Sequence, residues 1–365
     1  MCRAIQRWWD NLLAISVGKS DFYNFKYMNI IFNRNKTQIL KGLALILMIF
    51  HHTIASGSWS ENAPELYGLL VRSSKICVWI FAFLVGYGFY CSSNKSLKYS
   101  LKRIALLLIP FWVILWGIFI PASYFSGTLS ELGTVDVIYN MFGISLSLNW
   151  YSWFVCFYIL AILSLPYLNR IIKSSPPQYG WLIVLLGYYV LSAGIHFLPN
   201  WDTNPLLHSL FNYSIVMPNV VLGFMCAKWN HEGVLPTWFE GKQKWPLCIL
   251  VVIVVLLIPG LNIPTKGFPL HAFITPFFIF AIVGIFNSFQ LKKVTSCLIK
   301  VGDLSMYMWF FHALFFTTTV NLYTKNLVFE PFHCFLYTFV MTFGLSYIAS
   351  WIIKKLITPI INRIK

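Results

Sequence analysis

The sequence predicts an all-α, polytopic integral membrane protein with about ten transmembrane helices and both termini in the cytoplasm. Of its 365 residues, 58% are hydrophobic and only 10% are charged, and the mean hydropathy is +0.70. A soluble domain carries about a quarter charged residues, so this composition excludes an ordinary globular protein. Aromatic residues make up 18% of the chain, which suits helices in lipid with Trp and Tyr at the interfaces.

Ten apolar segments are long enough to cross a bilayer core, which takes about 20 helical residues. Lys75 lies near the start of the second segment, and Pro218 and Asn219 are expected to interrupt the sixth. In chain order the segments are 37–56, 73–91, 101–123, 149–168, 179–198, 212–229, 246–263, 269–289, 304–322 and 332–353.

The basic residues fix the orientation of these helices, because cytoplasmic loops are enriched in Lys and Arg. With both termini in the cytoplasm, all but four of the 27 Lys and Arg residues fall on that side. The outer loops 124–148 and 199–211 contain none. Topology therefore explains the net charge of +16, and no nucleic-acid partner is expected. The four outer basic residues are Arg72, Lys75, Lys266 and Lys325.

The chain is expected to hold one transmembrane domain, 37–354, between two basic tails. The aromatic N-terminal tail, 1–36, either lies along the inner membrane surface or is poorly ordered, and the C-terminal tail, 355–365, is cytoplasmic. The eight Cys residues are scattered singly and are interpreted as small hydrophobes. No HExxH pattern, Gly-rich phosphate loop or GxSxG elbow is present, so no metal is expected.

The first helix carries two ionisable groups that share one face. Lys41 and His52 are eleven positions apart, which brings them within ~20° of one helix face and ~16 Å apart along the axis. His51 lies ~80° off this stripe. A cation at the inner end and a proton acceptor deeper in the membrane would suit a channel for an activated anionic donor. Alternatively, Lys41 snorkels to the interface and His52 is a hydrogen-bonded packing residue.

A second intramembrane histidine lies in the ninth helix. Ser305 and His312 are two turns apart and share a face, while Asp303 lies on the opposite side. Ionisable groups inside a membrane are costly, which makes His312 a functional candidate. The alternative is a histidine that donates to a backbone carbonyl between helices.

Further candidates lie near the ends of the third and fourth helices. Lys102 and Arg103 open the third helix; they serve topology, and a phosphate-rich donor such as coenzyme A would also need cations there. Trp150 and Tyr158 begin the fourth helix on the outer side, either as interface residues or as platforms for sugar rings. In the second helix, the glycines at 86 and 88 permit close helix approach.

Four stretches together resemble the acyltransferase 3 family, bacterial membrane enzymes that O-acylate envelope glycans. The likeness covers about 37–350. Its pieces are KGLALILMIFHH for the first-helix R-x10-H motif, IFAFLVGYGFY for FFFLSGY, LNWYSWFVCFYIL for the W-F/Y segment, and GDLSMYMWFFHALFF for the G-x-S-Y-x-I-Y-L-x-H helix.

The chain departs from the family pattern at three places. The Arg of R-x10-H is Lys41, which keeps the charge but loses bidentate geometry. The family's further R-x-x-R is reduced to Lys102 and Arg103, with Leu106 in the second Arg position, and the Ser of FLSGY is Val85. These changes affect the expected donor site more than the expected catalytic site.

The resemblance implies a multi-pass enzyme of the bacterial inner membrane that transfers an acyl group from cytoplasmic acyl-CoA to a carbohydrate or lipid-linked glycan. Acetyl-CoA is the default donor, and membrane lipids are the surroundings. His52 would be the general base and His312 would assist it; Lys41, Lys102 and Arg103 would hold donor phosphates. Trp150, Tyr158 and Ser305 are the candidate acceptor residues. The rival interpretation is a transporter or flippase for a polar or lipid-linked solute.

Overall fold

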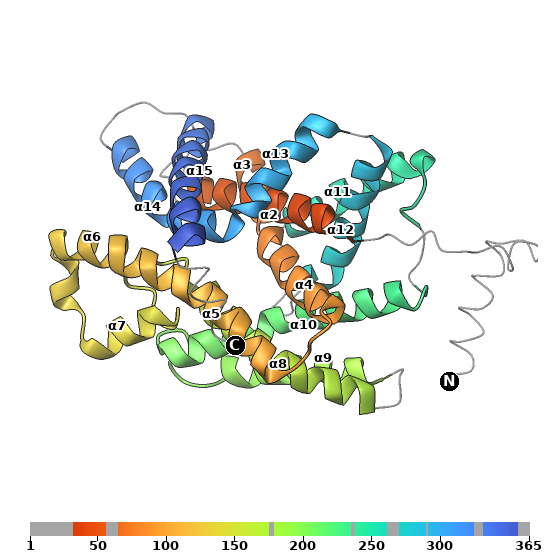
Figure 1. Cartoon of the computed structure of the whole chain (residues 1–365), viewed down its shortest axis with the longest axis horizontal. Coiled ribbons are helices and arrows are strands. Elements are labelled where there is room, and N and C mark those ends of the chain that lie inside the picture. Colours follow the sequence, from red (N-terminus) through yellow and green to blue (C-terminus); the bar gives the residue numbers. More distant parts are fainter. Residues whose placement is uncertain are drawn as a thin grey trace, which may run out of the picture.

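A computed structural model describes seven stretches of the chain, in which every regular element is a helix and no strand occurs (Figure 1). A helix satisfies all of its backbone hydrogen bonds within one segment, which is what a chain in lipid requires. The all-α prediction is confirmed for these residues. The described stretches are 32–55, 65–174, 179–234, 238–260, 270–289, 291–324 and 331–356.

In the described residues, each of the ten predicted segments overlaps one helix or two to three consecutive helices. Shorter pieces fill the connections: η4 (Thr128–Glu131), α7 (Thr134–Met141) and η5 (Lys242–Lys244). The main elements are α2 (Arg34–Ala55), α3 (Glu65–Ser74), α4 (Ile76–Cys91), α5 (Leu97–Ile114), the π-helix η3 (Leu115–Phe119), α6 (Ile120–Phe125), α8 (Trp153–Ser174), α9 (Gly180–His196), α10 (Pro205–His231), α11 (Trp245–Gly260), α12 (Leu270–Ser288), α13 (Lys292–Asp303), α14 (Ser305–Thr324) and α15 (Pro331–Leu356).

Seven helical stretches in the described ranges are long and apolar enough to cross a membrane, and α9 is a shorter apolar helix. They support a multi-pass membrane protein; ten spans and cytoplasmic termini stay predictions. Most of the predicted N-terminal tail lies outside the described residues, as does the C-terminal tail beyond α15. The seven stretches are Arg34–Ala55, Glu65–Cys91, Leu97–Phe125, Trp153–Ile172, Pro205–His231, Leu270–Ser288 and Phe332–Lys355.

The predicted interruption of the sixth span is wrong, because α10 continues through Pro218. Proline removes one backbone donor from the helix, and packing in the membrane interior offsets this loss. Pro218 and Asn219 are both buried, and the Asn219 side chain donates to the carbonyl oxygen of Trp79 in α4. Asn219 therefore attaches α10 to α4.

Three local irregularities interrupt the remaining spans. Lys75 separates α3 from α4, so the second predicted segment is built from two helices. The π-helix ends at Phe119, two residues before Pro121. Proline has no backbone N–H, so it cannot donate the helical hydrogen bond to the preceding turn. Leu304 separates α13 from α14, so Asp303 and Ser305 belong to different helices.

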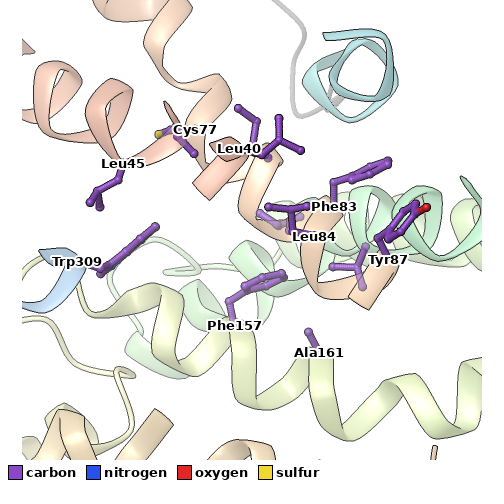
Figure 2. Packing of buried hydrophobic residues seen from close by; sticks show 14 of the residues in the cluster. Leu40, Leu45, Cys77, Phe83, Leu84, Tyr87, Phe157, Ala161 and Trp309 are labelled. Atoms are coloured by element: carbon purple, nitrogen blue, oxygen red, sulfur yellow. The ribbon is translucent and has the colours of Figure 1, made fainter. Parts of the chain in front are cut away.

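A single large apolar core joins the central helices. Figure 2 shows some of its members, among them Leu40 of α2, Phe83 of α4, Phe157 of α8 and Trp309 of α14. α10 packs along α4, α13 along α2 and α5 along α8. In Figure 1, α6 and α7 (yellow) lie at one edge of the molecule, away from α11 and α12.

Glycines permit the two closest of these helix contacts. A Cβ at Gly86 of α4 would overlap the carbonyl oxygen of Val220 in α10, and one at Gly223 would overlap that of Phe83. Gly42 of α2 and Gly302 of α13 lie in the same way against backbone carbonyls of the opposite helix. Small residues let helix backbones approach in lipid, so these pairs determine where α2 and α4 lie.

Replacing Gly86 with Ala should destabilise the protein, because the added methyl meets backbone that must move. Overpacking of this kind costs about 1–3 kcal/mol. Gly88→Ala is the matched control, since a Cβ there meets nothing within 4 Å. Thermal unfolding of the two variants in detergent should show a lower Tm for Gly86→Ala alone; equal Tm values would contradict the close contact.

Candidate functional site

Three aromatic side chains from three segments meet near the end of α2. The ring centroid of His52 lies 4.0 Å from that of Tyr151 and 5.2 Å from that of His312, and Tyr151 lies 4.7 Å from His312. The two imidazoles are stacked, with 30° between their planes. His52 comes from α2, Tyr151 from the segment before α8 and His312 from α14. We call these three residues the histidine group.

The hydrogen bond of His312 fixes which of its nitrogens can act as a base. Nδ1 lies 2.6 Å from the carbonyl oxygen of Trp309, which can only accept, so Nδ1 carries the proton. Nε2 is buried without a hydrogen-bond partner in the described chain, and the whole side chain is 1% exposed. The neutral ring therefore presents a lone pair at Nε2, as an acceptor or general base requires.

Two hydrogen bonds attach the segment that carries Tyr151 to α14. The Asn149 amide donates to the carbonyl oxygen of Phe310 at 3.3 Å, and the indole of Trp309 donates to the carbonyl oxygen of Tyr151 at 3.1 Å. Asn149 also accepts from the backbone of Tyr151. Asn149 is buried, so the groups that bond to it could not bond to water instead if the asparagine were replaced. These bonds hold Tyr151 against His312.

A second asparagine supports this segment from the preceding loop, 124–148. Buried Asn140 donates to the carbonyl oxygen of Asp136 and to the hydroxyl of Ser147, and accepts from the backbone of Leu148. One side chain thus closes the loop directly before residue 149. The loop 124–148 is therefore ordered near its end and supports the segment that carries Tyr151.

His51 points to a different helix from its neighbour. Its Nδ1 lies 2.8 Å from the carbonyl oxygen of Val71 in α3, whereas His52 faces Tyr151 and His312. Consecutive positions on a helix point about 100° apart, which accounts for the difference. At His52, the helical stripe thus faces the segment before α8 and α14.

A group of cations and phenols lies about three helical turns from the histidine group along α2. Arg103 donates to the hydroxyls of Tyr158 and Tyr99, each at 3.2 Å, and its guanidinium lies 5.9 Å from the centroid of the Tyr99 ring. Lys41 is largely buried and interacts electrostatically with Arg103 and with Asp303. We call Lys41, Tyr99, Arg103 and Tyr158 the cation group.

The end of α13 anchors the turn of α2 that precedes Lys41. Gln38 donates to the Asp303 carboxylate at 2.8 Å, directly beside the close contact of Gly302 with the Gln38 carbonyl. Asp303 is exposed, and its negative charge offsets part of the positive charge of Lys41. Among the described residues, no three His, Cys, Asp or Glu side chains are arranged to hold a metal ion.

Comparison with known proteins agrees with this arrangement. The model of the family described as an acyltransferase domain, acyltransferase 3, matches residues 36–351, nearly the whole chain. The chain belongs to the acyltransferase 3 family. Neither the curated proteins nor the solved structures give a significant match. The resemblance predicted from the four motif stretches is confirmed.

The acyltransferase 3 motifs contribute to both groups. The first-helix motif provides Lys41 and His52, and the helix of the last motif provides His312. Arg103 joins Lys41, whereas Lys102, next to it on α5, lies on the exposed side of the helix. Ser305 is buried at the start of α14, two turns before His312 on the same face.

Trp150 and Tyr158, predicted together as acceptor residues, lie apart in the structure. Trp150 is 75% exposed, and Tyr158 is half-buried and bonded to Arg103. Tyr151, next to Trp150, faces the histidines instead. Residues 149–152 precede the first turn of α8, so helical periodicity could not choose between Trp150 and Tyr151.

The sequence did not single out Tyr99, Asn149 or Tyr151. Tyr99 lies one turn before Arg103 on α5, which is a signal that helical spacing could have given. From the sequence alone, Asn149 could be described only as a polar residue before an apolar segment. Its partner, the Phe310 carbonyl, lies 161 positions further along the chain and could be identified only in the folded protein.

Replacing Asn149 with Leu should loosen the segment that holds Tyr151. The variant leaves the Phe310 carbonyl and the Tyr151 amide without this partner, at a cost of about 1–3 kcal/mol. Hydrogen–deuterium exchange of peptides covering 146–154 should become faster. Ser126→Ala, which removes an exposed hydrogen bond in the same loop, should leave that exchange unchanged. Unchanged exchange in Asn149→Leu would contradict the attachment to α14.

Proposed function

We propose that the protein is a membrane O-acyltransferase that transfers an acyl group, by default acetyl, from cytoplasmic acyl-CoA to a hydroxyl of a cell-surface or lipid-linked carbohydrate. Membership of the acyltransferase 3 family supports the reaction class. The observation that carries the proposal is the separation of two groups along α2. Cations lie near the end assigned to the cytoplasm, and two stacked imidazoles with a buried free Nε2 lie toward the other end.

The histidine group can move the proton that acyl transfer requires. His52 takes the proton from the acceptor hydroxyl as its oxygen attacks the thioester carbonyl carbon. The C–S bond of the tetrahedral intermediate then breaks, the ester forms, and the coenzyme A thiolate receives the proton from the imidazolium. His312, with its proton on Nδ1, accepts a hydrogen bond at Nε2 and orients the acceptor or His52.

The cation group suits the phosphates of an acyl-CoA. Arg103 is positioned by two phenol oxygens, which leave other N–H groups of its guanidinium for an anion. Lys41, half-buried like Arg103, adds a second positive charge that interacts with it. Two cations so close together repel each other, and a bound phosphate would relieve this repulsion.

The family and the apolar helices support a membrane location for the enzyme. The enzyme would lie in the bacterial inner membrane, take its donor from the cytoplasm and take its acceptor from the outer side. A transporter would not need an unpaired imidazole nitrogen beside a second imidazole. Acyl content of the surface glycan separates the two functions, because only the enzyme changes it.

Replacing His52 with Ala should abolish acylation while the protein stays inserted. Loss of a general base lowers turnover by about 10²–10⁴-fold. Mass spectrometry of surface polysaccharide from cells with the wild-type gene, without it, and with the variant measures the effect. His196→Ala, an exposed histidine at the end of α9, is the control and should acylate normally. Normal acyl content in the His52→Ala cells would rule out the mechanism.

Arg103→Gln should raise the KM for acyl-CoA, because the charge-assisted contact with phosphate is lost. Such hydrogen bonds contribute about 1.5–3 kcal/mol, which corresponds to roughly 10–100-fold. Steady-state transfer by purified protein measures the change. Lys98→Gln, an exposed lysine on the same helix, should keep the wild-type KM. If both variants bind the donor equally well, Arg103 does not contact it.

A further inference from the structure

A cavity of about 730 Å³ opens between the ends of α4, α8 and α10, on the side that the basic residues assign to the cytoplasm. This volume lies within the range of small-molecule pockets, about 300–1,000 Å³. The cavity is separate from the histidine group, whose three residues do not line it. The lining side chains that matter here are Phe32, Tyr87, Tyr90, Lys95, Asn169 and Asn230.

Aromatic rings form one part of the cavity wall. Phe32 lies 4.6 Å from Tyr87 between ring centroids, and Lys95 Nζ lies 5.4 Å from the centroid of Tyr90. Tyr87 belongs to the core, and its hydroxyl, which points away from the other labelled core residues in Figure 2, accepts from the Asn230 amide at 3.0 Å. Aromatic faces of this kind stack on a nucleobase, with about 1–3 kcal/mol per base.

Asn169 lines the cavity and carries a buried amide oxygen, which a turn of the side chain would present to a ligand. Its side chain is 9% exposed, and Oδ1 has no hydrogen-bond partner in the described chain. A buried acceptor without a donor costs about 1–3 kcal/mol, so a ligand that donates to it gains that energy. An asparagine amide can both donate to and accept from the N6/N7 edge of adenine. Asn169 therefore points to a ligand with an amino group.

The charge of the lining suits an anion. Lys95 is cationic, and no carboxylate is among the described residues that line the cavity. Lys95 Nζ uses one of its three donors on the Ser92 carbonyl at 2.9 Å, which leaves two for a ligand. Glu232, beside the cavity, is offset by Lys228 at 3.9 Å. An aromatic wall, an amide acceptor and a lysine together suit a nucleotide.

The cavity is joined to the cation group through α5 and the turn before it. Ser92 lines the cavity, and its side chain interacts with that of Tyr99, whose hydroxyl accepts from Arg103. A ligand with its base in the cavity could therefore place phosphates beside Lys95 and Arg103. We propose that this cavity binds the adenine nucleotide end of the acyl-CoA donor, while its acyl arm extends past Lys41 toward His52. This inference rests on the proposed function and adds a distinct binding site to it.

Coenzyme A binding to full-length protein in nanodiscs tests the proposal, with isothermal titration as the readout and adenosine 3′,5′-bisphosphate as the competitor. Asn169→Leu and Lys95→Gln should each weaken coenzyme A binding at least tenfold, and the bisphosphate should compete for wild-type protein. Lys95 lies at the half-exposed rim, so its variant tests the site without disturbing the core. Asn212→Leu, which lies ~27 Å away along α10 from Asn230, is the control with wild-type affinity.

The outcomes separate the two proposals. If wild-type protein binds coenzyme A and both variants bind it equally well, the cavity assignment is overturned and the proposed function stands. If the bisphosphate does not compete, the nucleotide end binds elsewhere, which also overturns the assignment. If wild-type protein does not bind coenzyme A, the donor itself is wrong and both proposals fail together.

Discussion

The arrangement of the site depends on hydrogen bonds made inside an apolar bundle between the start of α8 and α14. Asn149 donates to Phe310, and Trp309 donates to Tyr151, so each segment fixes the backbone of the other. In an environment without competing water, such bonds are the alternative to unpaired polar groups, which are costly. They bring Tyr151 to His312, and the geometry of α2 then brings His52 to both. Without this attachment, three residues from distant parts of the chain would have no reason to meet.

The helices that carry the two groups are held by a second constraint, the close approach of backbones at glycine. α2 lies against α13 at Gly42 and Gly302, and α4 lies against α10 at Gly86 and Gly223. Lipid gives helices little hydrophobic reason to associate, so close packing and buried amides such as Asn219 supply the attraction. The separation of the cation group and the histidine group along α2 follows from that helix, because Lys41 and His52 are eleven residues apart on it.

Positively charged side chains and uncharged imidazoles lie at different positions along the bundle. The end assigned to the cytoplasm holds Lys41, Arg103 and Lys95 with phenol and amide partners, and the deeper region holds neutral imidazoles among aromatic rings. An anionic donor is attracted to the first region, and a proton can be exchanged in the second. The proposed reaction needs both properties at two separate points, and α2 carries a residue of each group.

The sequence by itself determined the helical class, the positions of the apolar segments and the face of α2 shared by Lys41 and His52, because hydropathy and the 3.6-residue period are local properties. It also identified the family, since four short motifs occur in order. Only the tertiary structure decided that Pro218 lies inside a continuous helix, that Tyr151 rather than Trp150 faces the histidines, and that Tyr158 binds Arg103. Those outcomes depend on contacts between residues far apart in the chain. Local sequence patterns cannot predict these contacts, because the side chains and their partners meet only when the helices pack.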